Sequence, residues 1–75
     1  MNRDHLAAQE LRSRRINQGL SPEQLGGVVG VSGHTIRRIE REGVIPTPRI
    51  QFALAHHFQI QPTDLWSPRH RTVSP

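Results

Sequence analysis

Residues 20–40 read LSPEQLGGVVGVSGHTIRRIE and carry the signals for two short helices joined by a tight turn. Ser21 is a good N-cap, a proline follows at the first helical position, and Gln24 stands where a capping box needs Glu or Gln. Gly30 breaks this helix, and Ser32 can cap the next one. Two helices of about two turns each around a glycine turn predict a helix-turn-helix.

Apolar periodicity and turn residues predict five helices in all. Their expected bounds are about residues 3–18, 22–29, 33–42, 48–58 and a last turn at 61–66. The first helix is expected to have one apolar side, formed by Leu6, Ala7, Leu11 and Ile16. Thr47 is expected to cap the fourth helix, whose apolar residues recur every four positions at Ile50, Leu54 and Phe58.

These features predict an all-α fold, a compact bundle of five short helices in which the second and third form the helix-turn-helix. A chain of 75 residues, 33% of them apolar, is one domain with a thin core, and its lack of Tyr disfavours a sheet. We expect residues 1–66 to form this domain. Residues 67–75 contain two prolines and no apolar periodicity, and are expected to be a basic flexible tail.

Several function classes find no support in the residues. No cysteine is present, so a disulfide framework and a thiolate metal site are excluded. His56 and His57 are adjacent and point about 100° apart on a helix, so they cannot clamp one ion, and we expect no metal or cofactor. Without a convincing catalytic arrangement or an apolar span, we expect neither an enzyme with a small-molecule substrate nor a membrane protein.

A stripe of basic residues marks the predicted third helix. All ten basic residues of the chain are Arg, against six acidic residues, which gives a net charge of +4. At about 100° per residue, Ile36 and Ile39 face the body of the protein. The opposite side carries what we call the cationic stripe, which consists of His34, Arg37, Arg38 and Arg41. Because like charges so close repel each other, the stripe favours a polyanionic partner over a merely solvated face.

The spacing of the apolar residues around the turn then suggests a family. The positions concerned are the turn glycine Gly30 and the apolar Leu25, Val29, Val31, Ile36 and Ile39. In this spacing, without a gap, the chain resembles the helix-turn-helix domain of lambdoid phage repressors, Cro proteins and their bacterial relatives. The resemblance extends over about residues 6–66, because Leu11, Arg15 and the two last helices also fit.

The resemblance implies that the third helix enters the major groove of double-stranded DNA. The residues expected at or near base edges are Ser32, Gly33, His34, Arg37 and Arg38. Thr35 and Arg41 are expected to contact phosphate. Arg15 and Glu40 match a pair that forms a salt bridge in relatives, tying the first helix to the third.

Two further expectations concern the fourth and fifth helices. Arg49 lies at the start of a helix, where free N–H groups attract anions, and is expected to bind phosphate. Relatives pair two domains on a two-fold operator, so that their recognition helices lie about 34 Å apart. We expect a homodimer here through Ile50, Leu65 and Trp66. The alternative places Trp66 in the core and leaves the free protein monomeric.

The chain departs from the family pattern at three positions. Pro22 replaces a Gln that commonly touches phosphate, so this contact must weaken or move. Gly26 stands where Ala usually packs the two helices together, beside Gly27. Since a glycine inside a helix costs about 1 kcal/mol relative to alanine, the second helix is expected to be marginal. Gly33 lacks a side chain that could read a base, which shifts specificity to His34, Arg37 and Arg38.

Two hypotheses about function remain from different classes. The first is a sequence-specific transcriptional regulator of phage or bacterial origin, a repressor or Cro-like protein acting in the cytoplasm of a bacterial cell or phage-infected host. The second is a protein-interaction or antitoxin-like module that uses the same basic helix face.

Overall fold

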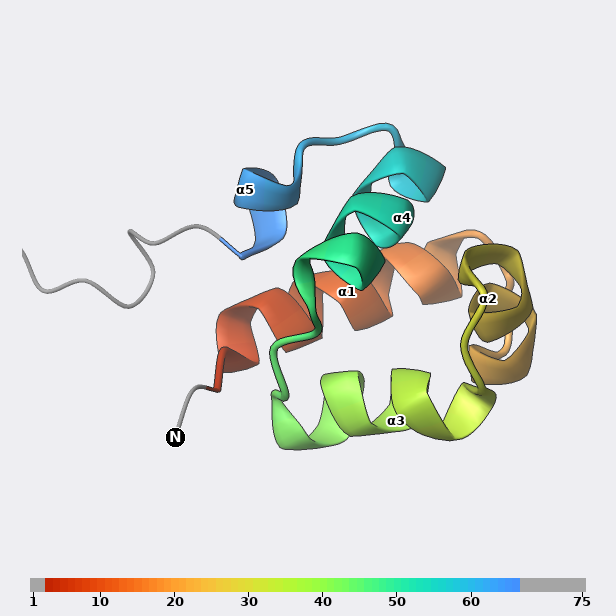
Figure 1. Cartoon of the computed structure of the whole chain (residues 1–75). Coiled ribbons are helices and arrows are strands. Elements are labelled where there is room, and N and C mark those ends of the chain that lie inside the picture. The colour runs from red at the N-terminus through yellow and green to blue at the C-terminus, as the bar shows by residue number, and fades with distance from the viewer. Residues whose placement is uncertain (1–2, 67–75) are drawn as a thin grey trace, which may run out of the picture.

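The computed structural model describes residues 3–66, and all five predicted helices are present (Figure 1). They are α1 (His5–Asn17), α2 (Pro22–Val29), α3 (Gly33–Glu42), α4 (Pro48–Phe58) and α5 (Pro62–Leu65). None of these helices has the length and hydropathy needed to cross a bilayer. The all-α fold is therefore confirmed. The tail predicted for residues 67–75 lies outside the described residues.

Hydrogen-bonded caps set the bounds of α2 and α3 where the sequence predicts them. The Ser21 side chain accepts a hydrogen bond from the backbone N–H of Gln24 at 3.0 Å, and the Gln24 side chain accepts one from the Ser21 N–H at 2.8 Å. Ser32 accepts a hydrogen bond from the N–H of Thr35 at 3.1 Å and so begins α3. Gly30 has a φ of 84°, a left-handed conformation that favours glycine, and α2 ends there.

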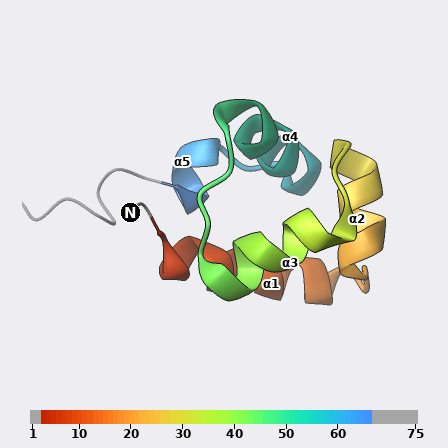
Figure 2. The same cartoon turned by 60° about the horizontal axis from the view of Figure 1, so that its bottom comes forward.

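The helices enclose one core, with α3 along one side of the bundle. In both views α2 and α5 lie at opposite ends, and α3 packs against α1 and α2 (Figures 1 and 2). The core consists of buried residues from every helix together with Trp66, namely Ala7, Leu11, Leu25, Ile36, Ile39, Leu54, Phe58, Leu65 and Trp66. This packing leaves the opposite side of α3 exposed at the surface of the protein.

The start of α1 is attached to the end of α3. Asp4 accepts a hydrogen bond from the N–H of Ala7 at 2.9 Å, so α1 begins at His5 and not at Arg3 as predicted. The backbone N–H of Asp4 donates to the carbonyl of Gly43 at 2.8 Å. Arg3 instead pairs with Val44 in an antiparallel bridge. The segment before α1 is therefore attached to the two residues that follow α3.

The apolar side predicted for α1 is wrong at two of its four positions. Leu6 is 62% exposed and Ile16 is 49% exposed, whereas the side that packs inward consists of Ala7, Ala8, Leu11 and Arg15. At about 100° per residue, Leu6 and Ile16 each lie about 140° away from Leu11. The inward side is instead completed by two small alanines and by an arginine that has an acidic partner in α3.

The predicted cap of α4 is correct in position but not in mechanism. Thr47 is the N-cap residue with extended backbone angles, yet its side chain makes no capping hydrogen bond. The side chain of Gln51 instead donates to the carbonyl of Pro46 at 2.8 Å, and the Gln51 N–H donates to the Thr47 carbonyl at 2.9 Å. Pro48 at the first helical position then starts the helix with a fixed φ.

Candidate nucleic-acid interface

A close backbone contact that requires glycine holds α2 against the turn before α3. A Cβ on Gly26 would lie 2.5 Å from the carbonyl oxygen of Val31 and 3.0 Å from the carbonyl carbon and oxygen of Ser32. A Cβ on Gly27 would meet nothing within 4 Å. Gly26 therefore permits the approach that positions α3, and only Gly27 is a plain cost to the helix.

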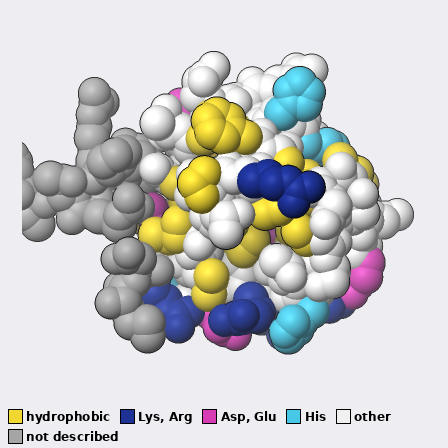
Figure 3. Space-filling model, in the orientation of Figure 1, with side chains coloured by type: hydrophobic (Ala, Val, Ile, Leu, Met, Phe, Trp, Pro, Cys, Tyr) yellow, Lys and Arg dark blue, Asp and Glu magenta, His cyan; other side chains and the backbone are white. Residues whose placement is uncertain are grey.

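The two sides of α3 differ as the periodicity predicts. Ile36 and Ile39 are buried, with exposed fractions of 0% and 2%. Of the cationic stripe, three residues are exposed and Arg37 is half-buried. Basic and histidine side chains accordingly gather along the lower edge of the molecule in Figure 3, where α3 runs. The helix thus presents a row of hydrogen-bond donors to the outside.

Acidic residues partly neutralise the cationic stripe. Arg37 forms an ion pair with Glu23 of α2, and Arg38 lies 3.5 Å from a carboxylate oxygen of Glu42. Arg41 takes part in no ion pair within residues 3–66. The pKa of Glu23 is lowered by a hydrogen bond from its own backbone N–H and by the one from Arg37, so this carboxylate is charged at neutral pH.

The residues at the start of α3 cap the helix and also contribute to its outer surface. Ser32 is exposed, and its hydroxyl lies 3.2 Å from that of Thr35, which is half-buried. Gly33 is buried, because the side chain of Glu23 passes over it. The structure therefore brings Ser32, Thr35 and His34 to one end of the cationic stripe, whereas Gly33 presents little surface of its own.

Arg15 and Glu40 are in direct contact between α1 and α3. Two hydrogen bonds join them, from Nε to Oε2 at 2.8 Å and from Nη2 to Oε1 at 3.0 Å. Their side chains are 11% and 4% exposed. These hydrogen bonds raise the pKa of Arg15 above its usual value, while burial acts in the opposite direction. The pair lies behind the cationic stripe and fixes α3 to the bundle.

A hollow separates the cationic stripe from the start of α4. It has a volume of about 260 Å³ and is lined mainly by apolar residues of the segment between α3 and α4, by Ile50, and by His34 and Arg38. Arg49 is exposed at the second position of α4 and takes part in no ion pair within residues 3–66. A cation at this helix start favours an anion there.

The residues predicted at a dimer contact differ in exposure. Leu65 and Trp66 are 0% and 5% exposed and belong to the core, as in the alternative reading of Trp66. Ile50 is half-buried. Sequence reasoning missed Phe52, which is 64% exposed on α4 although its helix carries the apolar residues of the core. Enclosed side chains offer little to a partner, and Ile50 lines the hollow beside α3, so an apolar contact through α4 depends on Phe52.

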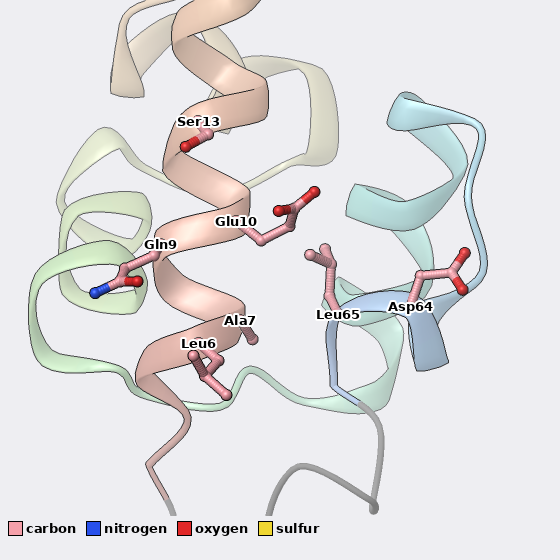
Figure 4. A pocket seen from close by; sticks show the side chains of 7 residues that line it. All are labelled: Leu6, Ala7, Gln9, Glu10, Ser13, Asp64 and Leu65. Atoms are coloured by element: carbon pink, nitrogen blue, oxygen red, sulfur yellow. The ribbon is translucent and has the colours of Figure 1, made fainter.

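A second hollow, between α1 and α5, holds two carboxylates that do not form a pair. Its volume is about 430 Å³. In Figure 4 Glu10 points from α1 toward α5, while the carboxylate of Asp64 points away from it. Glu10 pairs with Arg14 at 2.9 Å, and Asp64 accepts a hydrogen bond from the N–H of Gln61 at 2.9 Å. Residues 3–66 contain no cluster of metal-ligating side chains.

Comparison with known families and structures gives a consistent result. Residues 6–65 match the family model described as a helix-turn-helix domain. The chain is similar to the c2 repressor of phage P22, solved in complex with a synthetic operator. The two are 32% identical, with a TM-score of 0.76, over 80% of this chain and 91% of the repressor chain.

Two further solved structures are similar. The DNA-binding domain of the P22 c2 repressor in solution is 28% identical, with a TM-score of 0.74, and the match covers 99% of this chain and 96% of that one. The restriction-modification controller protein C.AhdI from Aeromonas hydrophila is 28% identical, with a TM-score of 0.72, over 81% and 92% of the two chains. No curated protein sequence matches the chain.

Proposed function

Because the chain belongs to the helix-turn-helix domain family, we propose that it is a transcriptional regulator that binds double-stranded DNA, with α3 reading the major groove. The observation that carries this proposal is the outer side of α3. There the cationic stripe faces outward while Ile36 and Ile39 anchor the helix in the core. A helix of this width fits the major groove, and arginines can donate to the paired acceptors of guanine.

The proposed contacts are divided between bases and phosphates. Ser32, His34, Arg37 and Arg38 are assigned to base edges, whereas the buried Gly33 is not, because the side chain of Glu23 covers it. Thr35, Arg41 and Arg49 are assigned to phosphates on either side, with Arg49 at the N-terminus of α4. We expect two copies to bind a two-fold operator, since one recognition helix reads too few base pairs to find a single site in a genome.

A selection experiment tests the proposal. The protein selects binding sites from a library of randomised DNA duplexes, and fluorescence anisotropy then compares the selected duplex with a random duplex of equal length at several salt concentrations. We expect the selected site to bind at least about 10³-fold more tightly. A single enriched sequence with a two-fold repeat would further support the dimer.

The result that would contradict the proposal is binding that does not distinguish the selected duplex from a random one. If selected and random duplexes bind equally, or if no duplex binds at low salt, the protein is no sequence-specific regulator. The same face would then serve another macromolecule, as in the protein-interaction hypothesis.

A further inference from the structure

The ion pair between Glu23 and Arg37 joins the two helices of the helix-turn-helix across its outer side. Glu23 lies in the first turn of α2, and Arg37 lies in the middle of α3. The contact joins Oε2 of Glu23 to Nη2 of Arg37, whose side chains are 58% and 38% exposed. The carboxylate therefore holds one end of a guanidinium that belongs to the cationic stripe.

Gly33 provides the space for this contact. A Cβ on Gly33 would lie 2.8 Å from Cγ, Cδ and Oε2 of Glu23, the same oxygen that accepts from Arg37. Gly33 does not have a positive φ, so its backbone conformation does not require glycine. What the residue contributes is the missing side chain, which lets Glu23 cross from α2 to α3.

The pairing changes what Arg37 can bind. A guanidinium has five N–H donors, so one occupied Nη2 hydrogen leaves donors for a guanine edge. A held side chain also loses less conformational freedom on binding than a free one. The carboxylate beside it repels a phosphate but not a neutral base. Glu23 therefore disfavours phosphate contacts by Arg37 relative to base contacts.

We propose that Glu23 is a positioning residue for DNA specificity, which orients Arg37 through the space left by Gly33 and keeps it from binding phosphate indiscriminately. The proposal rests on the proposed function, because it concerns the ratio between specific and random DNA. It assigns this role to a residue that has no place in the cationic stripe itself.

Glu23→Gln tests the proposal with a nearly isosteric side chain. The matched control is Glu10→Gln, which removes the same charge from another exposed ion pair, with Arg14 on α1. Affinities for the selected duplex and for a random duplex are measured across salt concentrations. Glu23→Gln should bind the random duplex about three- to tenfold more tightly at low salt and steepen its log K against log salt slope by about 0.9. Its ratio of specific to random affinity should fall about tenfold.

Two additional variants separate positioning from charge and from folding. Gly33→Ala changes no charge but displaces the Glu23 carboxylate, and should lower the same ratio. In an Arg37→Ala background, Glu23→Gln should leave the ratio unchanged. Circular dichroism confirms that each variant is folded.

The possible results separate a failure of the role proposed for Glu23 from a failure of the proposed function. If the wild-type protein discriminates but Glu23→Gln keeps its ratio, or if Glu10→Gln lowers the ratio equally, Glu23 does not position Arg37. If the wild-type protein itself does not discriminate between the duplexes, the proposed function fails and this role fails with it.

Discussion

Arg15 of α1 donates two parallel hydrogen bonds to Glu40 of α3, at 2.8 and 3.0 Å, and a third from Nη1 to the carbonyl of Leu20 at 2.8 Å. One guanidinium thus joins the first helix, the turn before α2 and the helix that carries the cationic stripe. The arrangement satisfies an arginine and a carboxylate that are both largely removed from water. Because the core of a 75-residue chain is small, we expect the loss of one partner in this contact to lower the stability of the fold measurably.

The first prediction concerns the loss of one partner. Arg15→Met should lower the free energy of unfolding by about 3–5 kcal/mol, because Glu40 would be left as an unpaired buried carboxylate. Urea denaturation measures the change. Arg14→Met, which removes an exposed partner of Glu10, should cost no more than about 1 kcal/mol. The double variant Arg15→Met, Glu40→Met should be more stable than Arg15→Met alone; equal stabilities would contradict the role of the pair.

The second prediction uses the adjacent glycines of α2. Gly26→Ala should lower the free energy of unfolding by about 1–3 kcal/mol, because its Cβ would collide with the backbone of the turn. Gly27→Ala has open space and should raise it by up to about 1 kcal/mol, since alanine is the better helix former. Thermal unfolding of both variants checks the signs. If Gly26→Ala is stabilising, the close approach is not required.

Local signals explain how much of the fold the sequence predicts. Helix ends depend on nearby residues, so Ser21, Ser32 and Gly30 predict the bounds of α2 and α3 correctly. The inward side of α1 depends on packing partners instead. Apolar Leu6 and Ile16 are exposed. The apolar residues of α1 are too scattered for their periodicity to show which side of the helix packs inward.

In the candidate site, too, the sequence predicts the features that depend on residues close together in the chain, but not those that depend on contacts between helices. The cationic stripe is a property of one helix, so its spacing alone predicts which residues face outward. The Glu23–Arg37 ion pair joins two helices and residues 14 positions apart, so no local pattern indicates it. Gly33 illustrates the consequence: the sequence shows only a missing side chain, and the structure shows the carboxylate that occupies its space.

The third prediction concerns two members of the cationic stripe. Arg37→Ala and Arg38→Ala should each weaken binding to the selected duplex more than to a random duplex, because a bidentate base contact provides about 1–3 kcal/mol of discrimination. Competition titrations with both duplexes measure the difference. Equal losses on both would show that these arginines contact phosphates only.

The fourth prediction concerns Arg49 at the start of α4. Arg49→Ala should lower the affinity for every DNA sequence and flatten the slope of log K against log salt by about 0.9, because one phosphate contact is lost. Arg14→Ala removes the same charge from α1, where it is paired with Glu10, and should change the slope much less. An unchanged slope in Arg49→Ala would exclude the contact.

The last prediction concerns assembly. Leu65 and Trp66 are enclosed in the core, and Ile50 lines the hollow beside α3, about 160° away from Phe52 around the helix. A two-fold contact through α4 therefore needs the exposed Phe52. We expect the free protein to associate weakly and the operator to favour the dimer, because DNA that holds two copies with recognition helices about 34 Å apart supplies part of the association energy.

Phe52→Ser should therefore reduce cooperative binding to a two-fold site without changing binding to a single half-site. Leu6→Ser is the matched control, because Leu6 and Phe52 are 62% and 64% exposed but Leu6 lies on α1. Analytical ultracentrifugation of the free proteins and their complexes gives the stoichiometry. One protein per two-fold site at saturating concentration would exclude the dimer. Equal losses of cooperativity in both variants would show that the dimer contact does not lie on α4.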